Sequence, residues 1–310
     1  MSSPSFAGSN GPVSLRDCLV GANPIIWSND DFPELAGDVP LDVILGEMRE
    51  AGFAGSELGH AYPRTAPALG AALARHRLQL VSGWHSTYLA SRELAAEETA
   101  FRAHLDLLKS LGASVAIVAE CTHAIHGARD TALGFGAADR PQLDSEEWSR
   151  LTAGLTRLCT LASDAGLKAV YHHHMGTVIQ TEAELDRLLA DVPDLWLLLD
   201  PGHLAFAGID PVRVAQRHAK RIAHVHLKSV RAPVVERVRR ERWSFCRAVT
   251  EGVFTIPGEG AVDFPAIFRV LADAVYRGWL VVEAEEDPTK VPALPKAVKA
   301  RAYVREQAGV

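Results

Sequence analysis

The sequence predicts an α/β protein built as a single (β/α)8 barrel, in which eight parallel strands are each followed by a helix. Three observations support this prediction. Strand-like and helix-like segments alternate from one end of the chain to the other. The strand-like segments are apolar throughout, as is typical of parallel strands that are buried on both faces. No Gly-x-Gly-x-x-Gly segment follows the first strand, which disfavours the alternative of an open doubly wound sheet.

Each predicted strand is a short apolar run, and an amphipathic segment with helical spacing follows it. Thr181 and Glu184 predict a capping box at one helix start, while Asp210 and Asp263 each precede a first turn that contains proline. The strands are predicted at residues 18–26, 53–58, 78–83, 114–119, 167–173, 195–200, 222–228 and 279–284. The helices are predicted at residues 40–51, 66–76, 93–111, 145–165, 181–190, 209–219, 263–274 and 292–307.

Two connections between these elements are too long to be simple turns. They cover residues 120–144 and 229–262, and both follow strands. In a barrel, segments that follow strands lie on the face where the strands end, and long segments there commonly form site walls or lids. We therefore expect both connections to border a functional site.

The composition favours one large soluble domain. The chain has 310 residues, of which 48% are hydrophobic and 23% are charged, and its formal net charge is −6. The acidic balance argues against nucleic acid as a partner, and no apolar run is long enough to span a membrane. Four scattered cysteines indicate a reducing compartment. We expect a cytoplasmic protein with a disordered lead-in over residues 1–15 and a single barrel domain over residues 16–310.

The most informative feature for function is the residue type at the ends of four predicted strands. The apolar runs at residues 169–174, 195–203, 222–229 and 279–286 each carry His, Asp or Glu toward their carboxyl ends. Side chains at the carboxyl ends of barrel strands meet on one face, where barrels build active sites. Imidazole and carboxylate groups from four strand ends predict one site for a divalent metal such as Mn²⁺, Co²⁺, Fe²⁺ or Zn²⁺. The absence of paired cysteines argues against a structural zinc site.

Strand alternation selects the residues that point toward this site, because successive side chains face opposite sides of a strand. Each residue taken singly has an ordinary alternative, since a buried His often bonds a backbone carbonyl and an Asp at a strand end often caps a helix. The coincidence across four strands is what favours a site. The inward-facing candidates are His172, His174, Asp200, His203, His224, His226, Lys228, Glu283 and Glu285.

The chain also resembles the inosose dehydratases of the xylose isomerase-like barrel superfamily over nearly its whole length. The most specific motifs are NPIIWSNDD, which begins at Asn23, and YHHHMGT, which begins at Tyr171. The resemblance implies a xylose isomerase-like TIM barrel and a hydro-lyase of inositol catabolism. Such an enzyme removes water from 2-keto-myo-inositol to give a trihydroxycyclohexane-1,2-dione. The matching segments are residues 23–38, 52–64, 171–181, 197–203, 224–231, 254–264 and 277–288.

By position, the resemblance implies a metal site with four protein ligands. Three of them are carried over directly, and the fourth has two candidates. The fourth ligand is His172, with His174 as the alternative. Glu120 stands where three-metal relatives carry a histidine, so a single Mn²⁺ or Co²⁺ is expected. Ser229 replaces an aspartate that relatives usually carry, which leaves the positioning of its loop open. The resemblance also implies a dependence on glutathione and a homo-oligomer, either a dimer or a tetramer. The three ligands carried over directly are Asp200, His226 and Glu283.

A metal in this site would act as a Lewis acid on the ketone, while side chains move protons off the neighbouring carbon and onto the leaving hydroxyl. The sequence leaves these proton-transfer roles open among His203, Glu57, Lys228 and Glu259, with His203 preferred because it lies beside the metal. The alternative for His203 is a hydrogen bond that orients Asp200. The expected substrate contacts are Trp27, Asn29, His85, His174 and Glu259. Core packing is the alternative for Trp27 and for His85.

Three other functions are considered for the same barrel. A metal-dependent ketose epimerase or isomerase would return the proton instead of losing water, and would need acid–base carboxylates on both faces of its substrate. A DNA-repair nuclease would need three metals and a basic groove, of which the sequence gives no sign. A polyol-binding protein without activity is disfavoured by the four metal-type strand ends.

Overall fold

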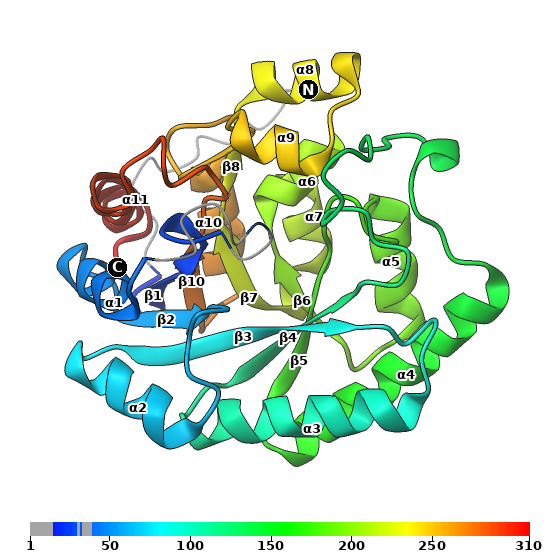
Figure 1. The fold of residues 1–310 in the computed structure, drawn as a ribbon, viewed down its shortest axis with the longest axis horizontal. Helices are drawn as coiled ribbons and strands as arrows, with labels where there is room; N and C mark the ends of the chain where they lie inside the picture. Colours follow the sequence, from blue (N-terminus) through cyan, green and yellow to red (C-terminus); the bar gives the residue numbers. More distant parts are fainter. Residues whose placement is uncertain (1–14, 30–31, 33–38) are drawn as a thin grey trace, which may run out of the picture.

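The computed structural model describes residues 15–29, 32 and 39–310, which form a closed barrel of eight parallel strands (Figure 1). Around the barrel the strands follow the order β1, β10, β7, β6, β5, β4, β3 and β2, and β1 pairs with β2 to close it. The single-domain (β/α)8 barrel that the sequence predicts is confirmed. The strands are β1 (Leu19–Ala22), β2 (Gly55–Leu58), β3 (Gln79–Thr87), β4 (Val115–Glu120), β5 (Lys168–His172), β6 (Trp196–Leu199), β7 (Ile222–Leu227) and β10 (Trp279–Val282).

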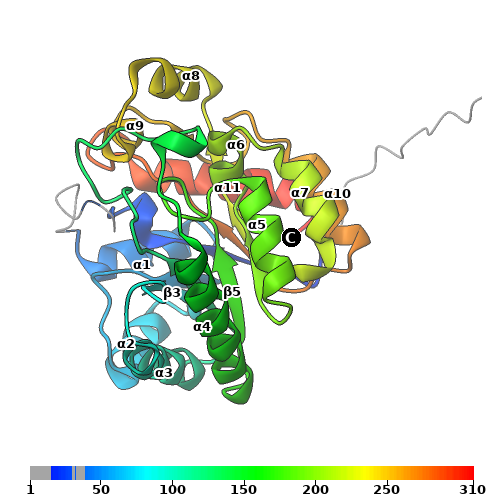
Figure 2. The same ribbon diagram turned by 90° about the vertical axis from the view of Figure 1, so that its right-hand side faces the viewer.

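All eight predicted helices are present and lie outside the barrel (Figures 1 and 2). Thr181 accepts from the backbone of Glu184 in the expected capping box, and Asp210 and Asp263 cap their helices as predicted. These caps satisfy backbone N–H groups that the first turn of a helix leaves unpaired. The helices are α1 (Leu41–Glu50), α2 (Ala66–Arg75), α3 (Leu94–Ser110), α4 (Ser145–Asp164), α5 (Glu182–Asp191), α7 (Pro211–His218), α10 (Phe264–Asp273) and α11 (Ala293–Ala308).

The two long connections form an ordered layer over the carboxyl ends of the strands. They are joined to each other, since the backbone N–H of Leu133 donates to the carbonyl of Trp243 at 2.9 Å. Their apolar side chains build a second core together with Phe32 and Phe206. Figures 1 and 2 both place α8 and α9 together at one end of the molecule. The elements in and below this layer that the sequence did not predict are α6 (Pro201–Ala207), β8 (Ser229–Val230), α8 (Ala232–Glu241), α9 (Phe245–Thr250) and β9 (Phe254–Thr255).

The largest differences from the sequence-based expectation are at the ends of two strands, and the start of the folded domain also differs. The first strand ends at Ala22 because Asn23 caps a short 3-10 turn, η1 (Pro24–Ile26). The third strand continues to Thr87. Leu15, expected in the lead-in, is buried in the main core, so the folded domain begins at least one residue earlier than predicted. The rest of the predicted lead-in, residues 1–14, lies outside the described residues.

Within the described ranges, none of the helices is both long enough and apolar enough to cross a membrane.

Candidate metal centre and adjoining cavity

The four expected metal ligands lie together at four adjacent strand ends. His172 ends β5, Asp200 follows β6, His226 lies in β7 and Glu283 follows β10, and these strands are consecutive neighbours in the barrel. His172 Nε2 lies 3.3 Å from Asp200 Oδ2. His226 Nδ1 lies 3.4 Å from the same oxygen and 2.6 Å from Glu283 Oε2. The structure thus brings the predicted ligands into one cluster.

Three atoms of this cluster fit a bound cation. Asp200 Oδ2, His226 Nδ1 and Glu283 Oε2 are buried, and none makes a hydrogen bond of acceptable geometry with the described part of the chain. They instead lie against charged neighbours, since His226 Nδ1 is 2.6 Å from Glu283 Oε2 and Lys228 Nζ is 3.2 Å from Asp200 Oδ2. A cation bound by all three atoms would occupy a place where buried imidazole and carboxylate donors already converge. Burial lowers the pKa of His172 despite the nearby carboxylate of Asp200, so this imidazole is neutral, as a ligand must be. Imidazole and carboxylate donors suit Mn²⁺, Co²⁺, Fe²⁺ or Zn²⁺.

The geometry favours His172 over His174 as the fourth ligand. His172 Nε2 faces Asp200, whereas His174 Nδ1 lies 2.8 Å from the carbonyl oxygen of Met175. A carbonyl only accepts, so His174 carries its proton on Nδ1 and a lone pair on Nε2. The ring of His174 packs against the ring of His203, with centroids 3.8 Å apart. His174 is therefore part of the wall beside the cluster.

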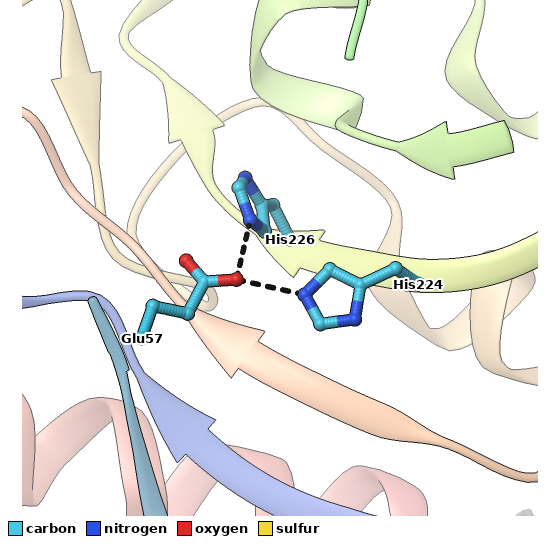
Figure 3. Close-up of side chains that lie close together, drawn as sticks. All are labelled: Glu57, His224 and His226. Carbon is cyan, nitrogen blue, oxygen red and sulfur yellow. Dashed lines mark hydrogen bonds and ion pairs between the residues drawn. The ribbon is translucent and has the colours of Figure 1, made fainter. Parts of the chain in front are cut away.

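Glu57, in β2, holds the imidazole of His226 in place (Figure 3). Its Oε1 accepts hydrogen bonds from His224 Nε2 at 2.8 Å and from His226 Nε2 at 3.2 Å. Ser82 Oγ donates to the same oxygen at 2.6 Å, and Asn23 Nδ2 donates to Oε2 at 2.7 Å. Burial would raise the pKa of the Glu57 carboxyl, but His226 and His224 hold it well below its usual value. An ionised carboxylate held by four donors is better suited to orienting His226 than to the proton transfer that the sequence suggested.

Lys228 and His203 lie behind the cluster. Lys228 Nζ hydrogen bonds to His203 Nε2 at 2.9 Å, to Glu283 Oε1 at 2.7 Å and to Glu285 Oε2 at 2.9 Å. Burial would lower the pKa of Lys228, but Asp200, Glu283 and Glu285 raise it well above its usual value. Burial holds the pKa of His203 well below its usual value, so this ring is neutral. The backbone N–H of His203 donates to Asp200 Oδ1 at 3.0 Å, in line with the alternative role of orienting Asp200.

A cavity of about 300 Å³ opens beside the cluster. Its wall combines cluster ligands with other titratable groups, so a substrate bound there would contact the proposed metal and several acid–base candidates together. Lys228 and His203 are not among the residues of the described ranges that line it. The structure thus separates these two residues, expected to transfer protons, from the space where a substrate would bind. Members of the wall include Glu57, His172, His174, His226, Glu283 and Glu285.

Two of the expected substrate contacts pack elsewhere. His85 points outward from β3 to α3, where its ring lies 5.2 Å from that of Phe101 and 5.3 Å from that of His104. Burial lowers the pKa of His85 to about 4. Trp27 is buried in the main core, and its Nε1 donates to Glu47 at 2.6 Å. For both residues the structure therefore supports the core-packing alternative and corrects the expected substrate contact.

Glu259 and Asn29, which were also expected to contact the substrate, do not line the cavity either. Glu259 faces α11, where Lys299 Nζ donates to it at 2.7 Å, and Thr255 Oγ1 donates to it at 2.9 Å. Desolvation would raise its pKa, but these bonds and the charge of nearby lysines lower the pKa to about 2. Asn29 is buried, and its Oδ1 accepts from the backbone N–H of Phe32 at 2.9 Å. These contacts are with the local chain, and neither residue lines the cavity described above.

Several cavity residues were not selected as site residues from the sequence, among them Trp84, Arg64 and His126. Trp84 faces inward from β3, with its ring 5.2 Å from that of His172. The predicted third strand ended at residue 83, and the register of β2 and β3 shifts just before Trp84, so regular alternation along the sequence would not have selected it. Arg64 lies at the cavity within a motif that served only as a family marker. His126 lies in a long connection, with its ring 4.8 Å from that of His174, and no periodic signal marks it.

Comparisons with known proteins agree on the fold and on one group of enzymes. The family model for the xylose isomerase-like TIM barrel matches residues 45–307. An inosose dehydratase of Geobacillus thermodenitrificans is 45% identical over 293 residues, which is 94% of this chain and 97% of that protein. The rhizopine catabolism protein MocC of Rhizobium meliloti is 46% identical over 289 residues, which is 93% of this chain and 87% of that protein.

Among solved structures, a D-allulose 3-epimerase of Methylomonas sp. in complex with D-allulose superposes with a TM-score of 0.66. The match covers 96% of this chain and all of the other, at 19% sequence identity. At that identity the likeness supports the shared barrel and no shared activity.

Proposed function

Because the chain belongs to the inosose dehydratases of the xylose isomerase-like TIM barrel family, and is therefore a hydro-lyase, we propose that it removes water from 2-keto-myo-inositol in inositol catabolism. The product would be a trihydroxycyclohexane-1,2-dione. One observation carries the proposal. Three buried ligand atoms that make no hydrogen bond with the described residues converge beside a cavity, in a chain that is 45% identical to an inosose dehydratase. The proposed centre holds one divalent metal, Mn²⁺ or Co²⁺, through His172, Asp200, His226 and Glu283.

In each of the two carboxylates of the cluster, one oxygen accepts a hydrogen bond from the protein and the other is left for the metal. Asp200 Oδ1 accepts from the backbone of His203, which leaves Oδ2 for the metal. Glu283 Oε1 accepts from Lys228, which leaves Oε2. Anchoring one oxygen of each carboxylate fixes the direction of the other before a metal binds. A metal bound there would act as a Lewis acid that polarises the ketone oxygen.

His174 is the side chain best placed to accept the proton from the carbon next to the ketone. Its Nδ1–H is committed to the carbonyl of Met175, and burial holds its pKa well below the usual value, so Nε2 is unprotonated at neutral pH. His126 lines the same cavity and is the candidate for protonating the leaving hydroxyl. His203, preferred from the sequence, would support the ring of His174 from behind.

The polyol ring would lie against Trp84, whose aromatic face suits the C–H side of a sugar-like ring. Arg64 brings a guanidinium to the same cavity, where it can donate to hydroxyl oxygens.

We propose further that activity depends on glutathione, that the enzyme is a cytoplasmic dimer or tetramer, and that neither nucleic acid nor a membrane is a partner. Assays with and without glutathione, and light scattering of the purified protein, test the first two of these statements.

The central test is to incubate the metal-loaded protein with 2-keto-myo-inositol and follow the absorbance of the dione. We expect dione formation that stops when the metal is chelated and returns when Mn²⁺ or Co²⁺ is added. An epimerised or isomerised ketose in place of the dione would replace the proposal by the epimerase alternative. A metal-loaded protein that binds the ketone without converting it would leave only the polyol-binding alternative.

A further inference from the structure

Four ligand-type atoms surround the ammonium group of Lys228. The distances from Nζ are 2.7 Å to Glu283 Oε1, 2.9 Å to Glu285 Oε2, 2.9 Å to His203 Nε2 and 3.2 Å to Asp200 Oδ2. Three carboxylates and one imidazole form a donor set that divalent metals also take. Lys228 therefore lies where a cation would be coordinated, directly next to the proposed metal centre.

The surrounding chain is built to admit this side chain and to exclude water from it. Lys228 is fully buried, and Nζ lies 4.7 Å from the centre of the Phe254 ring. At the start of α6, a Cβ on Gly202 would lie 2.6 Å from Lys228 Cγ. A residue with a side chain at position 202 would push the lysine out of its place, so the glycine makes room for it.

The charges of the cluster also need a second cation. Around the proposed metal and Lys228, Asp200, Glu283 and Glu285 bring three negative charges, and Glu57 adds a fourth behind His226, held there by its own four donors. A divalent metal supplies only two positive charges. Lys228 supplies the third. Because a buried charge without a partner costs several kcal/mol, a carboxylate set of this size is stable only with both cations in place.

We propose that the ammonium group of Lys228 occupies the second cation position of a two-cation centre and thereby keeps the centre mononuclear. Glu283 would bridge the two positions, with Oε2 toward the metal and Oε1 on Lys228. Shared carboxylates of this kind connect the ions of two-metal enzymes, which lie about 3.5–4 Å apart. The inference rests on the proposed metal site. It adds that shortening Lys228 opens a second divalent site, made of Asp200, His203, Glu283 and Glu285.

The test measures metal stoichiometry and the electron spin resonance of bound Mn²⁺ in the full-length protein. Wild-type protein should bind one Mn²⁺ per chain, with an uncoupled signal even at excess metal. Lys228→Ala, which removes the charge and opens the space, should bind two Mn²⁺ per chain with a spin-coupled signal. His203→Ala in addition should remove the second ion.

Two control variants separate the loss of the lysine's charge from the loss of its volume. Lys228→Met removes the charge but keeps most of the volume, so it should bind no second ion. Lys296→Ala removes another lysine that is paired with a glutamate, Glu286, and should bind one ion like the wild type.

A folded Lys228→Ala protein that binds a single uncoupled Mn²⁺ would overturn the inference. If that variant does not fold, the inference is tested on the wild-type protein at excess metal. A spin-coupled Mn²⁺ pair in the wild type would overturn it, because Lys228 would then not hold the second cation position. Wild-type protein that binds no divalent metal would overturn the metal site of the proposed function itself. The two failures are therefore distinguishable.

Discussion

Glu57 accepts a hydrogen bond from Nε2 of His226 at 3.2 Å, although the two residues are 169 positions apart in the sequence. This bond decides which nitrogen of His226 faces the cluster, because the donor nitrogen is committed to Glu57 and Nδ1 is left toward Glu283. Carboxylates that orient a ligand histidine in this way are common in metal sites. Glu57 therefore acts through His226 as a positioning residue.

Replacing Glu57 tests this role. In Glu57→Gln the charge is lost, and an amide cannot serve the same set of donors, so His226 should lose its fixed orientation. We expect the affinity for Mn²⁺ to fall by about 10–100-fold, measured by calorimetry or by competition with a chelator. Glu259→Gln is the matched control and should bind metal normally, because Glu259 faces α11. Unchanged metal affinity together with a lost kcat would instead restore the proton-transfer role of Glu57.

The two oxygens of Asp200 can be separated by substitution. Asp200→Asn keeps an acceptor for the backbone N–H of His203, but it removes the charge that the metal requires. We expect a folded protein with almost no bound metal and no activity. Asp200→Ala loses the cap of α6 as well, and should be less stable than the asparagine variant by about 1 kcal/mol. Elemental analysis and thermal denaturation measure the two effects. An asparagine variant that keeps its full metal content would remove Asp200 from the ligand set.

Substituting Trp84 should change KM, whereas substituting Trp27 should change stability. Trp84→Ala removes a wall of the cavity and should raise KM about fivefold, since an aromatic contact with a ligand contributes roughly 1 kcal/mol. Trp27→Phe should leave KM unchanged and lower the free energy of unfolding by about 1 kcal/mol, because the bond to Glu47 is lost. Steady-state kinetics and urea denaturation check both. A raised KM in Trp27→Phe would return that residue to the substrate site.

His85 should make the protein less stable in acid. Its pKa is about 4 in the folded protein and 6.5 by its ordinary value. As the pH falls below 6.5, the unfolded chain binds a proton that the folded chain does not, so stability decreases until the pH reaches about 4. The full effect is at most about 3 kcal/mol.

His85→Leu removes this titration. The difference between its unfolding free energies at pH 7 and pH 4.5 should be smaller than in the wild type, as measured by urea denaturation. KM should be unchanged, because His85 faces α3 and not the cavity. An identical pH dependence would contradict the buried, neutral state of His85, and a raised KM would contradict its outward placement.

Local patterns explain why the barrel could be predicted. Apolar strands, capped helices and strand-to-helix alternation are properties of neighbouring residues, and the structure agrees with them at all eight units. Alternation predicted which side chains of these strands share a face, and the resemblance selected His172, Asp200, His226 and Glu283 among them as ligands. Small errors in strand length had larger consequences, because moving one residue along a strand reverses the face. His85, proposed as a substrate contact from the resemblance, lies beyond the predicted end of its strand, and there it is the neighbouring Trp84 that lines the cavity.

The sequence by itself determined the eight strand–helix units and the residue types at four strand ends, because both depend on spacing along a short stretch of chain. Only the tertiary structure decided which inward groups meet the cavity and which meet one another. It placed Glu57 on His226, and it placed Lys228 behind Glu283 rather than beside a substrate. The physical reason is that a buried charge is stable only with its partners, and these partners come from strands that are distant in sequence.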